Sequence, residues 1–216
     1  MGALLSLPRK IKPPTDPRPQ LVLFGSPARP WTPAAWHPVS DAVRGGRSHA
    51  SLAYLDPSRP DTQGVVFEGL LDAQTLGGAG FASVVFTHPI ALPRPHTLSA
   101  FLLDVDPLDP AAPGVHTFTL AVRDTPRSSA GPQLIFQADF SILPSDPPAA
   151  DAKLDQLLTV RIPFAALQPT LRGRPAPPNH KPFDPANLAQ ISLMARSFFG
   201  SQAGPFLLHV RRLAVQ

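Results

Sequence analysis

Apolar and polar residues alternate with a period of two along much of this chain, in short segments that end at Gly, Pro or Asp. In His116–Asp124, the clearest case, Phe118, Leu120 and Val122 fall on one face, and Thr117, Thr119 and Arg123 fall on the other. Such alternation is typical of a half-buried β-strand. The predicted strands are Leu21–Phe24, Ser48–Leu55, Val65–Leu71, Phe81–Thr87, Leu98–Val105, His116–Asp124, Leu134–Ile142, Leu157–Ile162, Ala189–Ala195 and Phe206–Val215.

The segments between these strands predict how the strands are assembled. Thr32 is a good N-cap and Pro33 suits the first helical position, so one helical turn is expected before Trp36. The predicted strands do not alternate with predicted helices, as the strands of a parallel sheet would. About ten short strands separated by turns therefore predict an all-β protein, an antiparallel sandwich or barrel.

Proline is unusually frequent, at 30 of 216 residues. Because proline lacks a backbone donor and breaks helix interiors, the chain cannot form a helical bundle, a coiled coil or a helical repeat. Residues 1–20 are expected to form a flexible, basic, proline-rich tail, and residues 21–216 a single domain. Three proline-rich insertions are interpreted as surface loops: Asp106–Gly114, Pro144–Asp151 and Leu171–Pro185.

The residue content argues against several classes of chemistry. With no cysteine, the chain has no disulfide, thiolate metal site or cysteine nucleophile. The single glutamate, Glu68, argues against the paired glutamates of sugar hydrolysis. The seven histidines lack the close spacing of metal ligands, and no Gly-x-Ser-x-Gly sequence is present. We therefore expect no catalytic residues, no metal site, no cofactor and no enzymatic activity.

Charge and hydropathy narrow the range of partners. The net charge is +4, but the Lys and Arg residues are scattered, so nucleic-acid binding is not expected. No run of 18 uninterrupted apolar residues predicts a transmembrane helix. The N-terminal residues Met1–Ser6 match the myristoylation pattern, so a weak acyl anchor at Gly2 stands beside the interpretation as a plain flexible tail.

An acidic segment has both a functional and a structural interpretation. Asp104, Asp106 and Asp109 could hold Ca²⁺ through their carboxylate oxygens. Pro107 and Pro110 stiffen this segment, and it lacks the glycine of the EF-hand loop. The sequence therefore leaves calcium binding open.

Five aromatic residues also allow two interpretations. Trp31, Trp36 and Tyr54 could stack on sugar rings, but so few large aromatics more often belong to the core. Phe198 and Phe199 lie between two predicted strands. Either the loop folds both rings beneath it, which the sequence favours, or one ring is exposed and contributes to a partner surface, because successive side chains alternate.

The strongest local signal is Val39–Leu52, where two glycines precede a strand. Gly45 and Gly46 are expected to be structural, because glycine adopts the positive φ of a sharp turn. A second glycine cluster, Gly77–Phe81, precedes another strand, and neither cluster has the Lys–Ser/Thr pair of a phosphate loop. Charge-assisted hydrogen bonds are expected to tie the first turn, among Asp41, Arg44 and Arg47.

Several short segments are unspecific one by one, but the order in which they follow one another is specific. A Trp precedes an Asp-x-x-x-Gly-Gly-x-Ser run, and Phe-x-Gly, Gly-Phe-Ala-Ser and Ile-Pro-Phe segments follow, then two C-terminal strands. In this series the chain resembles the NADH:ubiquinone oxidoreductase intermediate-associated protein 30 family over about residues 21–215. The residues that carry the resemblance are Trp36, Asp41, Arg44, Gly45, Gly46, Ser48, Gly80, Phe81, Pro163, Phe164, Gly204 and Phe206.

The resemblance implies a jelly-roll β-sandwich similar to galactose-binding and carbohydrate-binding modules. It also implies a chaperone-like assembly factor that binds intermediates of mitochondrial respiratory complex I, or other assembly factors. Two alternatives stay open. The first is a carbohydrate- or small-ligand-binding module, and the second is a cytoplasmic paralogue with an unrelated role, including an enzymatic one.

Overall fold

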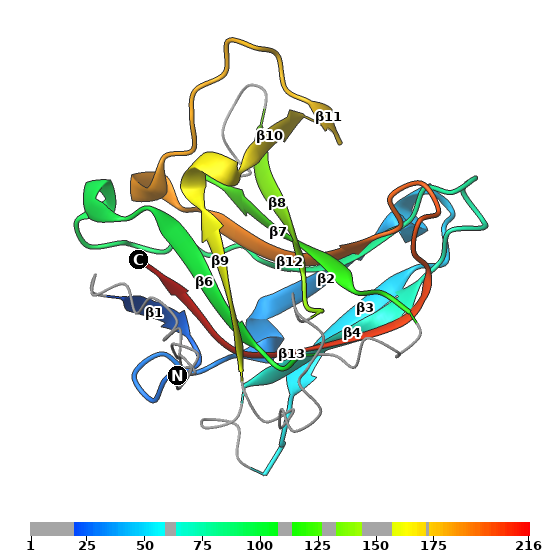
Figure 1. The fold of residues 1–216 in the computed structure, drawn as a ribbon, viewed down its shortest axis with the longest axis horizontal. Coiled ribbons are helices and arrows are strands. Elements are labelled where there is room, and N and C mark those ends of the chain that lie inside the picture. The colour runs from blue at the N-terminus through cyan, green and yellow to red at the C-terminus, as the bar shows by residue number, and fades with distance from the viewer. Residues whose placement is uncertain (1–19, 59–63, 108–113, 127–132, 144–156, 172) are drawn as a thin grey trace, which may run out of the picture.

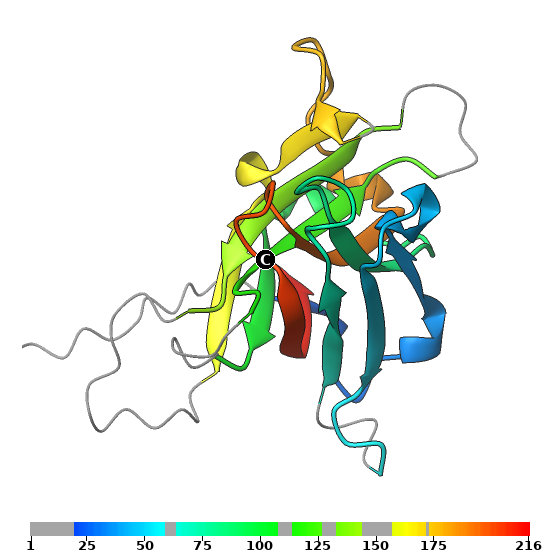
Figure 2. The same ribbon diagram turned by 90° about the vertical axis from the view of Figure 1, so that its right-hand side faces the viewer.

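Two antiparallel sheets face each other in the computed structural model (Figures 1 and 2). The structure describes residues 20–58, 64–107, 114–126, 133–143, 157–171 and 173–216. Residues 1–19 of the predicted tail, with the Gly2 acylation signal, lie outside the described residues, as do Asp109 and the insertion Pro144–Asp151. Within them, no helix reaches two turns, because the helical segments are 3₁₀ turns of three or four residues.

The first sheet is built around one long strand. In this sheet β13 pairs with β4, β6 and β1, while β3 and β9 flank the outer sides of β4 and β6. Its strands are β1 (Leu21–Phe24), β3 (His49–Tyr54), β4 (Val65–Leu71), β6 (Ala100–Val105), β9 (Leu158–Pro163) and β13 (Gly204–Val215).

The second sheet has seven strands in the order β11-β10-β8-β7-β12-β5-β2. These are β2 (Trp36–Ser40), β5 (Phe81–Phe86), β7 (Thr117–Arg123), β8 (Ile135–Ser141), β10 (Gln168–Leu171), β11 (Arg174–Pro175) and β12 (Gln190–Arg196). The 3₁₀ turns are η1 (Pro33–Ala35), η2 (Asp41–Arg44), η3 (Pro95–Thr97), η4 (Phe164–Ala166) and η5 (Pro185–Asn187).

The core fills the space between the sheets. Phe67 of β4 contacts Phe206 of the same sheet and Phe118 of the opposite sheet, with ring centroids 4.9 and 6.1 Å apart. Trp31 and Trp36 are buried in a second aromatic group with Phe24. Both tryptophans therefore belong to the interior, and neither offers an exposed ring for a sugar.

All ten predicted segments contain a strand, and the observed bounds differ by at most two residues. Three strands were not predicted. β2 contains Pro38 and lies at the sheet edge, where a missing backbone donor costs little. β10 ends at the first residue of the insertion Leu171–Pro185, and β11 lies within that insertion. Strand β7 is more deeply buried than the half-buried strand that its alternation predicts, because Thr119 on its polar face is fully buried.

Candidate functional site

Asp41 is the centre of a hydrogen-bond group at one end of the seven-stranded sheet. It begins η2 and is 2% exposed. Its Oδ1 accepts from the Ser48 amide at 3.0 Å, and its Oδ2 accepts from the Ser48 hydroxyl at 2.5 Å and the Phe81 amide at 3.1 Å. The carboxylate thus joins the start of β3 to the start of β5.

Of the three residues expected to tie this turn by charge-assisted hydrogen bonds, Asp41 does so, but the prediction for Arg44 and Arg47 is wrong. Among the described residues no ion pair joins Asp41 to either arginine, and both guanidinium groups leave the carboxylate to Ser48 and Phe81. Backbone and hydroxyl donors reach a carboxylate buried in a turn more easily than a long charged side chain, whose head remains in water.

The glycines of this end are required for two different reasons. Gly45 ends η2 at φ 84°, in the left-handed region that glycine adopts without strain. Gly46 has an ordinary φ, but a Cβ there would lie under 3.0 Å from Asp41 Oδ1. A Cβ on Gly80 would likewise lie under 3.0 Å from the Asp72 carbonyl. Close packing around Asp41 and Asp72, rather than conformational freedom, therefore excludes a side chain at Gly46 and Gly80.

Ser197 connects a third segment to the same end. Its hydroxyl donates to the Gly78 carbonyl at 2.7 Å and accepts from the Gly80 amide at 2.8 Å. Its own amide donates to the Gly80 carbonyl at 2.9 Å. Residues 41–48, 72–81 and 197–204 are thereby held together, and they gather on the right-hand side of Figure 1. We call this group the anchored end.

Phe198 and Phe199 lie at the tip of the anchored end. Both have positive φ, 47° and 58°, a region that costs a non-glycine residue about 1–2 kcal/mol. The guanidinium of Arg196 lies 4.7 Å from the Phe198 ring centroid and is paired with Asp139 at 2.6 Å. Phe198 is partly covered, whereas Phe199 is 92% exposed. Of the two arrangements left open by the sequence, the structure has the one with an exposed ring.

The other motif residues lie in the framework of the sandwich. Phe164 contacts Phe101 with ring centroids 5.0 Å apart, and Phe206 is buried beside Phe67. Pro163 ends β9, and Gly204 begins β13 at φ 105°.

The acidic segment proposed for calcium is occupied by arginine side chains. Asp104 pairs with Arg212 at 2.6 Å, and Asp106 pairs with Arg211 at 2.7 Å and contacts His209 at 3.0 Å. Burial raises the pKa of Asp106, but the hydrogen bonds and charge of Arg211, with a smaller effect of His209, hold it below its usual value. Each of these two carboxylates therefore neutralises an arginine of strand β13. In the described part of the chain, no three His, Cys, Asp or Glu side chains lie together as a possible metal site.

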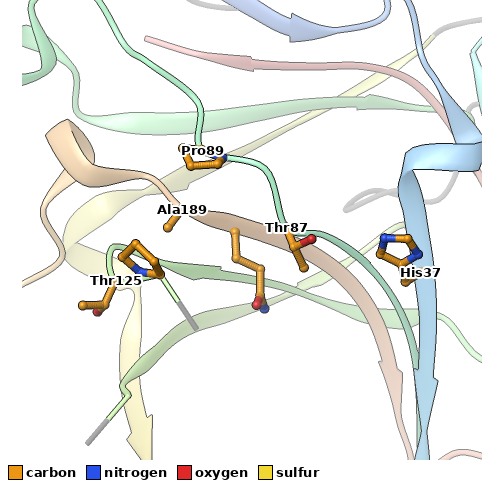
Figure 3. A pocket seen from close by; sticks show the side chains of 7 residues that line it. His37, Thr87, Pro89, Thr125 and Ala189 are labelled. Atoms are coloured by element: carbon orange, nitrogen blue, oxygen red, sulfur yellow. The ribbon is translucent and has the colours of Figure 1, made fainter. Parts of the chain in front are cut away.

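A cavity of about 470 Å³ lies at the opposite end of the same sheet. There β5 and β7 end and β2 and β12 begin. Figure 3 shows His37 and Thr125 on opposite sides of the cavity, with Thr87, Pro89 and Ala189 between them. The sequence did not predict this site, because its residues come from four distant segments without a shared motif. Its lining consists of His37, Thr87, Pro89, Thr125, Pro126, Ala189 and Gln190; we call this region the open end.

The described residues include no helix long and apolar enough to cross a lipid bilayer.

Comparison with solved structures shows the fold. The family 11 carbohydrate-binding module of Clostridium thermocellum, solved with a β-1,3-1,4-mixed-linked tetrasaccharide, superposes with a TM-score of 0.53 at 12% identity, over 91% of this chain and 94% of that chain. The same module family in a cellulosomal cellulase of that organism gives a TM-score of 0.49 at 14% identity, over 83% and 86%. The first likeness supports the jelly-roll sandwich.

Comparison of sequences shows the family. An uncharacterized protein of Schizosaccharomyces pombe (strain 972 / ATCC 24843) is 34% identical over 192 residues, which cover 87% of this chain and 80% of that protein. Residues 22–210 match the family described as complex I intermediate-associated protein 30. This match includes Asp41, the glycine turns and Ser197, so the chain belongs to the complex I intermediate-associated protein 30 family.

Proposed function

We propose that this protein is a non-enzymatic, chaperone-like factor that binds an assembly intermediate of respiratory complex I in mitochondria. Family membership supports a role related to complex I assembly. The main support for a binding site is the exposure of Phe199, an aromatic side chain that is 92% exposed at the tip of the anchored end. A large exposed aromatic held in one place is the kind of residue that dominates protein–protein interfaces.

The backbone around Phe199 supports a binding role. Two successive non-glycine residues with positive φ make this tip strained, and such strain collects at functional sites. The Ser197 hydrogen bonds and the Arg196–Phe198 contact restrict the loop before Phe199, and the Ser201 hydroxyl, which donates to the Phe198 carbonyl at 2.9 Å, restricts it after Phe199. A ring presented on a restricted loop loses little conformational freedom on binding, so more of its buried area contributes to affinity.

A second apolar side chain is exposed on the same end. Val43 in η2 is 79% exposed, while Asp41, two residues before it, is buried. The polar groups of Asp41, Ser48 and Ser197 are engaged in internal hydrogen bonds. The anchored end therefore offers a partner apolar side chains on a rigid base, which suits binding better than catalysis.

The test is affinity isolation from a mitochondrial extract with the wild-type chain, Phe199→Ala and Phe199→Gly. Wild type is expected to retain complex I subunits, and both variants to lose most of them. Glycine also relieves the positive φ, so Phe199→Gly should keep or slightly raise the free energy of unfolding. Loss of binding by a variant of undiminished stability would assign the effect to the ring.

Leu207→Ala is the matched control, because Leu207 is an exposed apolar residue on the outer side of β13. It should retain the subunits as wild type does. If Phe199→Ala and Phe199→Gly bind like wild type, the tip is not the binding site. If wild type itself retains no complex I subunit, the proposed function is wrong.

The location in the cell is tested by imaging a C-terminally tagged chain beside a Gly2→Ala variant. We expect a mitochondrial signal from both forms. A signal at other membranes that Gly2→Ala disperses would contradict the mitochondrial role and favour an acylated cytoplasmic paralogue, since one myristoyl chain gives weak, reversible anchoring.

A further inference from the structure

The open end holds an unsatisfied polar atom. Gln190 is 8% exposed and lines the cavity, and its Oε1 is buried without a hydrogen-bond partner among the described residues. A buried acceptor left unpaired is costly, and native structures almost always satisfy it. Trp36 Nε1, a buried donor without a hydrogen-bond partner among the described residues, lies instead among the core rings Phe24, Trp31 and Phe86.

The position of Gln190 follows from the register of the sheet. Its neighbour Ile191 faces the core and pairs with Phe86 and Val122. Because successive side chains alternate, Gln190 faces outward. His37 faces outward for the same reason, since Trp36 beside it is in the core. The cavity is therefore on the outer face of the seven-stranded sheet, open to a ligand from solution.

The lining residues define the chemistry of a ligand. None of them carries a permanent charge, so a neutral molecule fits without loss of ionic hydration. Thr87 and His37 can both donate and accept hydrogen bonds, and the Gln190 amide does both from adjacent atoms. The Thr125 hydroxyl donates to Asp124 Oδ1 at 3.0 Å and can accept from a ligand. Hydroxyl groups match this set, because each also donates and accepts. Pro89, Pro126 and Ala189 supply an apolar wall for the C–H side of a ring.

We propose that the open end binds a neutral, polyhydroxylated ligand of the size of one or two sugar rings, with a hydroxyl donating to Gln190 Oε1. The volume of about 470 Å³ lies within the usual range of small-molecule sites, roughly 300–1,000 Å³. This site lies at the other end of the sheet from Phe199 and makes no use of the partner surface.

The experiment is ligand-observed NMR on the full chain with D-glucose, D-galactose, D-mannose and cellobiose as probes, and N-acetylglycinamide as a neutral amide without hydroxyls. At least one sugar should bind saturably in the millimolar range. Gln190→Leu should weaken it about tenfold or more, as expected when one hydrogen bond to a buried acceptor is lost.

Two controls accompany this measurement. Gln137→Leu changes a glutamine on the outer face of β8, outside the cavity lining, and should leave sugar binding unchanged. Phe199→Gly should also leave it unchanged, so failure of the proposed partner site would not affect this result. Absence of saturable binding by every sugar, equal binding by Gln190→Leu, or preferential binding of the amide probe would each overturn the proposal.

Discussion

The two ends of the seven-stranded sheet differ in how their buried polar groups are satisfied. At the anchored end the carboxylate of Asp41 accepts three hydrogen bonds, and Ser197 makes three more with Gly78 and Gly80. At the open end the buried acceptor of Gln190 has no partner among the described residues. A satisfied group stabilises the protein itself, while an unsatisfied one represents free energy that a ligand can recover.

This difference separates the residues that a sequence motif identifies from the residues that are proposed to bind a ligand or a partner. Asp41 and Ser48, the buried family motif residues of the anchored end, are internal supports. In the proposed function their part is to hold Phe199 and Val43 outward. The sequence motif therefore identifies the base of the proposed partner surface more directly than the residues proposed to contact the partner.

Asp41→Ala should give the largest effect of the variants that test this comparison. It leaves the buried amide and hydroxyl of Ser48 and the partly buried amide of Phe81 without their acceptor, so we expect a loss of about 3–5 kcal/mol in the free energy of unfolding. Chemical denaturation measures it. Arg44→Ala is the control and should stay within about 0.5 kcal/mol of wild type; a comparable loss would restore the arginine as a partner of Asp41.

The two glycines of the turn should respond to alanine by different amounts. Gly46→Ala pushes a methyl group against a carboxylate that three hydrogen bonds hold in place, and should cost about 2–3 kcal/mol. Gly45→Ala meets no atom within 4 Å and costs only the strain of positive φ, about 1 kcal/mol. Thermal melts of both variants measure this, and the reverse order would contradict the packing argument.

Gln190→Leu should behave opposite to Asp41→Ala. Because it replaces a buried acceptor that has no partner with an apolar side chain of similar size, the free energy of unfolding should stay constant or rise by up to about 1 kcal/mol. The same denaturation series measures it. A loss of 2 kcal/mol or more, on the scale of a broken hydrogen bond, would mean that Gln190 is satisfied in the folded protein.

Asp72→Asn should have the smallest effect, visible only through pH. Hydrogen bonds from the Thr75 side chain and the Gln74 amide lower the pKa of Asp72 below its usual value. A carboxyl with a lowered folded pKa stabilises the protein above the unfolded pKa and loses this contribution as pH falls through the folded value. The melting temperatures of wild type and Asp72→Asn should therefore differ above pH 4 and converge below it; a constant difference would contradict this assignment.

The sequence predicted the architecture well because the pattern that indicates a strand lies within the strand and its flanking residues. Leu21–Phe24 and Val65–Leu71 have the predicted bounds, since apolar runs bounded by turn residues depend on nearby positions alone. β2 was missed because Pro38 argues against a strand unless its place at the sheet edge is known. β11 was missed because two residues in a proline-rich insertion carry no periodicity.

The two candidate sites, at the anchored end and at the open end, were harder to predict from the sequence than the fold. Asp41 was recognised as part of a turn, but its partner Phe81 is 40 residues away, and proximity of charge favoured the arginines instead. The exposure of Phe199 depends on two positive φ angles that no residue type requires. Gln190 has no motif at all, since its importance arises only where β2, β5, β7 and β12 meet.

Strand β13 has a consequence for how the chain folds. It completes the first sheet by pairing with strands from widely separated parts of the chain, with Leu21 opposite Val215 and Val65 opposite Val210. Contacts between such distant residues form slowly, because long loops have to close first. Until β13 arrives, β4 and β6 each expose an unpaired edge that can associate with other chains. The rate at which β13 docks should thus limit both the folding speed and the soluble yield of this protein.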